Sequence, residues 1–196
     1  DLVTIKGCQH FGGEAFLVMP AVQAERVTVR DCHSITRGAA LHFQEGDFSE
    51  NSKLVVDNCV FEMYADDFNN YRNEGDYAAA VYIGEADVVF DHVSITSTIV
   101  KSAGTDGFHR GVHIYRPGST VLISDNTFEN IGDTVANFAL NTSGGIRVVA
   151  SPASAEVEPL ITIRGNKFLD MAAATAIYAG SSGNYQIIGN LFNGAL

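Results

Sequence analysis

The sequence predicts an all-β protein, specifically a parallel β-solenoid in which the chain winds through repeated turns of strand. A strand-like segment recurs seven times in the 196 residues, its apolar residues alternate with a period of two, and the recurrences lie at least 24 residues apart. A period of two excludes helical repeats, whose apolar residues recur every 3.6 residues. A spacing of 24 residues or more fits one coil of a β-solenoid, with extra residues looping outward.

The recurring segment has two apolar positions, five and three residues before a position that we call the anchor. The segments are Val3–Cys8, Val27–Cys32, Leu54–Cys59, Val88–Val93, Val121–Asn126, Ile161–Asn166 and Tyr185–Asn190. A further apolar residue follows each anchor by two or three places, and these are Phe11, Ile35, Phe61, Ile95, Phe128, Phe168 and Phe192. We expect seven stacked strands whose alternate residues face one core.

The anchors are expected to stack as a ladder of three cysteines, one valine and three asparagines. Cys8, Cys32 and Cys59 form neither a Cys-x-x-Cys pair nor a close Cys/His cluster, and their odd number argues against a disulfide framework. Their wide spacing does not bring zinc ligands together locally. We interpret them as reduced, small apolar residues of the stack, with asparagine amides hydrogen-bonding between coils.

A second strand recurs in six coils as a triplet with apolar residues on either side of one outward residue. The triplets are Leu17–Met19, Leu41–Phe43, Val81–Ile83, Val112–Ile114, Ile146–Val148 and Ile177–Ala179. Their outward residues are Val18, His42, Tyr82, His113, Arg147 and Tyr178. The residues just before the triplets are small in five coils, namely Ala40, Ala80, Gly111, Gly145 and Ala176. We expect small residues beside polar-tipped ones to form a trough with functional groups along its floor.

Three long insertions, at about residues 62–78, 96–110 and 129–144, precede the second strand in consecutive coils. We expect them to form one wall over the outward residues, since long loops in a compact fold often carry function. The first insertion mixes carboxylates, amides and tyrosines, a composition suited to sugar binding.

The composition narrows the class of protein. Hydrophobic residues make up 46% of the chain, enough for a packed core, and 12 Lys+Arg against 23 Asp+Glu give a formal charge of −11. Because the few basic residues are scattered, we exclude a general nucleic-acid binder. No apolar run approaches the roughly 18 residues of a membrane span. No shift in composition marks a boundary, so we predict one domain over residues 1–196.

The repeat resembles the right-handed parallel β-helix proteins of the pectate-lyase-like superfamily over essentially the whole chain. Val88–His92 is similar to the Trp-Ile-Asp-His segment of pectate lyases, although the tryptophan is missing, and Asp106-Gly107 and Thr120–Asn126 follow it. The Arg-x-Pro-x-x-Arg segment is absent, as are the Asn-Thr-Asp, Gly-His-Gly and Arg-Ile-Lys motifs of polygalacturonases. The resemblance implies a right-handed β-helix of about seven coils, secreted or at the cell surface, that processes or binds polysaccharides.

Tyr82, His113 and Arg147 are the candidate catalytic residues. Stacked strands lie about 4.8 Å apart, so these three side chains are close enough to converge on one sugar ring. A uronic-acid lyase needs a cation for the carboxylate, a base for the ring proton and an acid for the leaving oxygen, roles that suit Arg147, His113 and Tyr82 in that order. Candidate substrate-binding residues are His42, Tyr178, Lys101, Arg110, Asp66 and Asp67, with Lys101 and Arg110 as alternative cation and base.

Two other functions fit the same sequence. A glycoside hydrolase would need two carboxylates, roughly 5–10 Å apart; the candidates are Glu45, Asp47, Asp66, Asp67, Glu74, Asp76, Glu85 and Asp106. The same acids suit Ca²⁺, which takes 6–8 oxygen ligands, although no calcium-loop motif is present and we name no metal ligand. The outward residues of the second strand would also serve a non-catalytic carbohydrate-binding or adhesive module, because tyrosine and histidine rings stack on sugars.

Neither end of the sequence carries an amphipathic segment that would cover the terminal coil of a solenoid. We therefore expect the domain to be part of a longer chain or to associate end to end with another copy.

Overall fold

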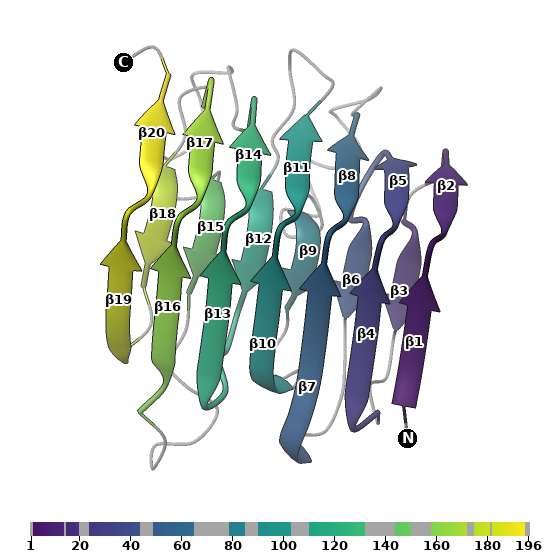
Figure 1. Ribbon diagram of the computed structural model, residues 1–196. Helices are drawn as coiled ribbons and strands as arrows, with labels where there is room; N and C mark the ends of the chain where they lie inside the picture. The colour runs from purple at the N-terminus through teal and green to yellow at the C-terminus, as the bar shows by residue number, and fades with distance from the viewer. Residues whose placement is uncertain are drawn as a thin grey trace.

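The computed structural model describes residues 2–13, 15–19, 24–43, 49–64, 79–84, 90–102, 110–131, 144–149, 158–171, 175–180 and 182–194. Over these ranges the secondary structure is entirely β, and every strand pairs in parallel with its neighbours (Figure 1). The same ranges contain no helix of the length and apolarity that a membrane crossing requires.

The strands form three sheets. Sheet A has the order β1 (Leu2–Lys6), β4 (Arg26–Arg30), β7 (Ser49–Asp57), β10 (Phe90–Thr96), β13 (Thr120–Ser124), β16 (Leu160–Arg164) and β19 (Asn184–Ile188). Sheet B has the order β2 (Gln9–Phe11), β5 (His33–Thr36), β8 (Val60–Met63), β11 (Ile99–Ser102), β14 (Thr127–Glu129), β17 (Lys167–Leu169) and β20 (Leu191–Asn193). Sheet C has the order β3 (Leu17–Met19), β6 (Leu41–Phe43), β9 (Ala79–Ile83), β12 (Arg110–Ile114), β15 (Gly144–Val148) and β18 (Thr175–Ala179).

Each sheet joins strands that are three apart along the chain, so the chain visits sheets A, B and C in turn and then begins again. Figure 1 shows sheets A and B end to end in front, with sheet C behind them. This arrangement is compatible with the expected β-solenoid. The sequence predicts the strands of sheets A and C, whereas the short strands of sheet B, just after each anchor, form a third strand in the repeat.

The fourth repeat lies five residues beyond its expected position. Val93 of β10 pairs with Leu54 of β7, so Val93 fills the first apolar slot. Ile99 of β11 pairs with Val60, which makes Thr98 the anchor of this repeat. The expected segment Val88–Val93 is therefore wrong, and the other six segments are correctly placed.

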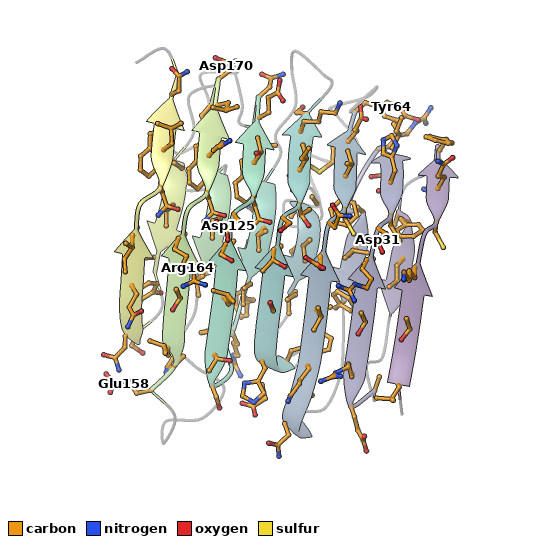
Figure 2. All side chains as sticks on the ribbon, in the orientation of Figure 1. Asp31, Tyr64, Asp125, Glu158, Arg164 and Asp170 are labelled. Carbon is orange, nitrogen blue, oxygen red and sulfur yellow. The ribbon has the colours of Figure 1, made fainter. Side chains whose placement is uncertain are left out.

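The turn between sheets A and B explains this shift. In all seven described turns the residue before the anchor has a positive φ of 51–66°; these residues are Gly7, Asp31, Asn58, Ser97, Asp125, Gly165 and Gly189. Glycine adopts this left-handed conformation freely, and Asn and Asp tolerate it better than most residues. Figure 2 labels two of them, Asp31 and Asp125, at the junction of the two sheets. The expected register would place His92 at this position, whereas the observed register places Ser97 there.

The anchors form the expected ladder, with threonine in place of valine. Asn166 Oδ1 accepts the side-chain amide and the backbone N–H of Asn126, each at 3.0 Å, and Asn190 Oδ1 accepts the same two groups of Asn166 at 3.0 Å. Asn126 Oδ1 in turn accepts the N–H of Thr98 at 2.9 Å. Thr98 Oγ1 accepts the N–H of Cys59 at 3.4 Å. The ladder thus satisfies polar groups that the turns bury in the core.

The three cysteines are free thiols, as predicted. Cys59 Sγ lies 3.3 Å from the carbonyl oxygen of Asp57 and 3.7 Å from that of Val29, so the protonated thiol donates to the backbone. Burial raises the pKa of Cys59 to about 12 and also raises that of Cys32. Both groups therefore remain protonated and serve as small buried members of the ladder.

All three sheets contribute to one hydrophobic core. In sheet B the buried residues in register include Ser34, Phe61 and Phe128. Phe11 and Ile35, which we expected to face the core, are register partners one residue beyond this row, and Phe11 is 62% exposed. Phe128, Phe168 and Phe192 stack with ring centroids 5.1 Å apart. Each fully buried large aliphatic or aromatic side chain contributes about 1.5–3 kcal/mol, so these rows hold the sheets together.

The small residues that precede the sheet C triplets face this core. A Cβ atom added at Gly111 would collide with the ring of Phe128, and one added at Gly145 would collide with the ring of Phe168. Ala40 is fully buried in the same core. Gly111 and Gly145 are small because the phenylalanine row of sheet B occupies the space opposite. The expectation that they widen an external trough is therefore wrong.

The ladder leads to a prediction for stability. Asn166→Ala should lower the free energy of unfolding by about 2–4 kcal/mol, because it leaves buried polar groups of Asn126 without an acceptor. Asn190→Ala should cost about 1 kcal/mol, since Asn190 lies in the last repeat and is partly exposed. Urea unfolding followed by circular dichroism would measure both values. Equal losses at the two positions would contradict the ladder as a source of stability.

Candidate functional site

The candidate site is a row of side chains on the outer side of sheet C. It comprises His42, Tyr82, His113, Arg147 and Tyr178, which we call the polar row. Each comes from the middle of a triplet, and each lies in register with the next, from β6 through β9, β12 and β15 to β18. The sequence therefore predicts this row and its order correctly.

Neighbouring members of the polar row contact one another through their rings. The His42 ring meets the Tyr82 ring edge-on, with centroids 5.0 Å apart and an interplanar angle of 87°. Tyr82 and His113 are stacked at 5.1 Å and 12°. At the other end, the guanidinium carbon of Arg147 lies 5.0 Å from the ring centroid of Tyr178. Ring pairs and cation–π contacts of this kind contribute about 0.5–2 kcal/mol each, so the row is an ordered unit.

Arg110 joins the row at His113. It is the first residue of β12, and its Nη1 lies 3.4 Å from Nδ1 of His113. Its register partners are Ala79 and Gly144, so only small side chains flank it on the neighbouring strands. The sequence places Arg110 at the end of the second insertion. There it is an alternative to Arg147 as the cation or to His113 as the base. The structure instead brings it into direct contact with His113.

Glycines make room for the two tyrosines of the row. A Cβ atom added at Gly84 would overlap the ring and hydroxyl of Tyr82, and one added at Gly180 would overlap the ring of Tyr178. Each tyrosine ring therefore lies over the glycine two residues further along the chain. The Tyr-x-Gly pattern at these two places is the sequence signal for this packing, and sequence reasoning missed it.

Most of the row is buried, which differs from the expected solvated trough. The exposed fraction is 7% for His42, 2% for Tyr82, 3% for His113 and 7% for Arg147, and only Tyr178 is partly exposed. The outward direction of these side chains means only that they point away from the central core. Tyr82 forms a second, small apolar cluster with alanines of β9 and of the segment before β6.

Burial also sets the charge of the two histidines. It lowers the pKa of His42, and it lowers the pKa of His113 well below 6.5, with further lowering from the charges of Arg110 and Arg147. His113 is therefore a neutral imidazole close to two permanent cations. The Arg110 guanidinium can only donate, so the single lone pair of the neutral imidazole is on Nδ1, where it faces Arg110 Nη1.

The remaining predicted residues are not part of this row. Lys101 lies in β11 of sheet B, where its Nζ is 3.2 Å from Glu62, which also contacts His33 at 2.8 Å. Residues 96–102 of the predicted second insertion form the end of β10, a turn and β11. Asp66 and Asp67 lie outside the described residues, as do the other carboxylates considered for hydrolysis or Ca²⁺ binding. Within the described ranges, no three His, Cys, Asp or Glu side chains are grouped to hold a metal ion.

Comparison of the chain with protein-family models, with curated proteins and with solved structures finds no match. The resemblance to the pectate-lyase-like superfamily thus stays a prediction that rests on the repeat and on the parallel sheets.

The neutral state of His113 predicts a pH dependence of stability. Its folded pKa is lowered, so below about pH 6.5 the unfolded chain takes up a proton that the folded chain does not. The free energy of unfolding should therefore fall with decreasing pH, with His113 contributing up to about 1.4 kcal/mol per pH unit. His113→Gln should remove this contribution, whereas His33→Gln on sheet B should retain it. Denaturant unfolding at pH 7 and pH 5 would test this, and identical pH slopes in wild type and His113→Gln would refute it.

Proposed function

We propose that the chain is a polysaccharide-processing, right-handed parallel β-helix of about seven coils, related to the pectate-lyase-like superfamily, and that it acts on a uronic-acid glycan at the polar row. The observation that carries this proposal is the setting of His113. It is a neutral imidazole stacked on Tyr82, in contact with Arg110 and in register with Arg147. This combination supplies the base, the acid and the cations that β-elimination requires.

The proposed reaction is an elimination at a uronate residue. The guanidinium of Arg147 or Arg110 neutralises the carboxylate and stabilises the charge that develops next to it. When Arg110 turns to the carboxylate, Nδ1 of His113 is released and removes the proton from the ring carbon that bears the carboxylate. The electron pair forms a double bond to the neighbouring carbon as its bond to the glycosidic oxygen breaks, and the Tyr82 hydroxyl donates a proton to that oxygen. The products are an unsaturated uronate and a new sugar hydroxyl.

The partial exposure of Tyr178 supports a second function. Arg147 lies over the Tyr178 ring, which orders a partly exposed aromatic face at one end of the row. Such a face suits stacking against a sugar ring without catalysis. In this alternative the chain is a carbohydrate-binding or adhesive module, and the buried part of the row is its support. Either function suits a protein that is secreted or displayed at a cell surface.

An assay with a panel of uronic-acid and neutral polysaccharides separates these functions. For a lyase we expect absorbance from unsaturated uronate, and a loss of about 100-fold or more in His113→Gln. Lys167→Ala is the matched control, because it removes an exposed cation from β17 of sheet B and should leave the rate unchanged. Circular dichroism would confirm that both variants fold.

Other outcomes of this assay would overturn elimination. New reducing ends without unsaturated uronate would indicate hydrolysis. Binding without turnover would support the module, and Tyr178→Ala should then weaken binding about tenfold, the loss of one aromatic contact. If the protein neither binds nor turns over any uronic-acid glycan, the proposal is refuted.

We also propose that copies of the chain associate end to end. The first repeat exposes Leu2 by 73% and Phe11 by 62%, and the last repeat exposes Ile188 by 59%, Leu191 by 53% and Phe192 by 57%. The strands of these repeats also present one edge each without a partner strand in the described structure. Apolar surface and open strand edges together favour pairing with a similar edge.

Sedimentation velocity over a concentration series would test this association. Wild type should shift toward larger species as the concentration rises, and Phe192→Asp should remain monomeric. Ile99→Asp is the control, since Ile99 is 40% exposed but lies on an internal strand of sheet B. A wild-type monomer at every concentration would refute end-to-end association.

A further inference from the structure

A second cluster of reactive groups lies on sheet A, and the proposed glycan site does not use it. His92 of β10 connects a hydroxyl and a carboxylate through its two ring nitrogens. Its Nδ1 is 2.7 Å from Thr120 Oγ1 on the neighbouring strand β13, and its Nε2 is 3.3 Å from Asp91 Oδ2. His92 and Thr120 are also register partners in the sheet.

The carboxylate of this cluster is held in place from two neighbouring repeats. Asp91 Oδ2 accepts the backbone N–H of Asn51 at 2.9 Å, and Oδ1 accepts that of Ser119 at 3.1 Å. The N–H of Asp91 itself donates to Ser52 Oγ at 3.1 Å. Burial raises the pKa of Asp91, but its hydrogen bonds with Ser119 and Asn51 lower it by more, so the net pKa is below the usual value. Asp91 is thus a fixed, ionised acceptor near neutral pH.

The ionised carboxylate determines the direction of the proton relay. The negative charge of Asp91 favours the tautomer with the ring proton on Nε2, the nitrogen that lies 3.3 Å from Oδ2. In the neutral imidazole, Nδ1 then carries the lone pair and accepts from the Thr120 hydroxyl. The resulting order, hydroxyl to imidazole to carboxylate, is the order of groups that activates a serine or threonine nucleophile.

The cluster is accessible to a ligand from solvent. The side chain of His92 is 34% exposed, and Thr120 is partly exposed. On the other side of Thr120 its register partner Leu160, 40% exposed, offers an apolar contact. A hydroxyl between an imidazole and a leucine side chain suits a small substrate that has an electrophilic carbonyl and a short apolar acyl group.

We propose that Thr120 is a nucleophile for hydrolysis of short-chain carboxylic esters. Thr120 Oγ1 attacks the ester carbonyl as His92 Nδ1 takes the hydroxyl proton, and the proton then passes to the leaving alkoxide, which departs as the alcohol. Water next attacks the acyl-threonine, with His92 again taking a proton and returning it to Thr120 Oγ1. The net reaction converts ester and water to acid and alcohol and restores the residues. Asp91 positions His92 and stabilises its protonated form.

The test uses 4-nitrophenyl acetate as substrate and a fluorophosphonate as a covalent probe. Wild type should hydrolyse the ester and carry the phosphonyl group on the Thr120 peptide, as read by mass spectrometry. Thr120→Val, which replaces the hydroxyl by a methyl group, should lower the rate about 100-fold or more, and His92→Gln should have a similar effect. Thr120→Ser keeps the hydroxyl and should retain activity within about tenfold.

Two controls separate this site from general reactivity and from the glycan site. Thr162→Val changes a threonine of sheet A that is not next to a histidine, and it should leave ester hydrolysis unchanged. His113→Gln should abolish glycan elimination but not ester hydrolysis. Labelling of wild type elsewhere, or equal ester turnover in wild type and Thr120→Val, would overturn the proposal and assign the cluster to joining the strands of sheet A. Labelling at Thr120 in the wild-type protein tests the site even if a variant fails to fold.

Discussion

The fold depends on one constraint: the polar groups that each turn between sheets A and B buries in the core must find hydrogen-bond partners. The turn needs a residue with positive φ, and the anchor after it points inward with a backbone N–H that lies away from water. In four consecutive repeats that N–H is satisfied by the side chain of the next anchor, from Cys59 through Thr98 and Asn126 to Asn166. A valine anchor has no acceptor and would leave the N–H of Cys59 without this bond, at a cost of about 1–3 kcal/mol. The ladder therefore fixes both the residue type and the register.

The same constraint explains which parts of the fold could be predicted from the sequence. Alternation of apolar residues predicts six of the seven sheet A segments and all the sheet C triplets, because a residue that faces the core must be apolar. Alternation alone fails in the fourth repeat, where Val88 and Phe90 fit the two slots as well as Val93 and Ile95 do. The two registers differ in their turn residue, His92 or Ser97, and in whether the anchor has an oxygen. Backbone conformation and hydrogen bonding, rather than hydrophobicity, distinguish them.

The candidate site is predicted only in part for a related reason. Strand alternation places the five members of the polar row on the outer side of sheet C, and their stacking follows from the register. Alternation carries no information on what covers that side, so it did not predict that His113 and Arg147 are buried. The small residues beside them suggested a trough, whereas Gly111 and Gly145 are small because they face the phenylalanine rings of sheet B. The size of a residue in a strand is limited by the space on the side of the sheet that this residue faces.

The two histidine clusters show how one residue type takes different states on two sheets of one protein. His113 lies near two arginines, so burial and positive charge act in the same direction and keep it neutral. His92 lies between a fixed carboxylate and a hydroxyl, so its tautomer is set by the groups that it contacts. Within a row, each side chain lies about 4.8 Å from the members of the same row on the two neighbouring strands, so these members set its electrostatic surroundings. Since His92 is on sheet A and His113 on sheet C, a substitution in one cluster leaves the immediate contacts of the other intact. The proposed glycan and ester reactions therefore use groups on different sheets, and variants of one cluster report on that cluster alone.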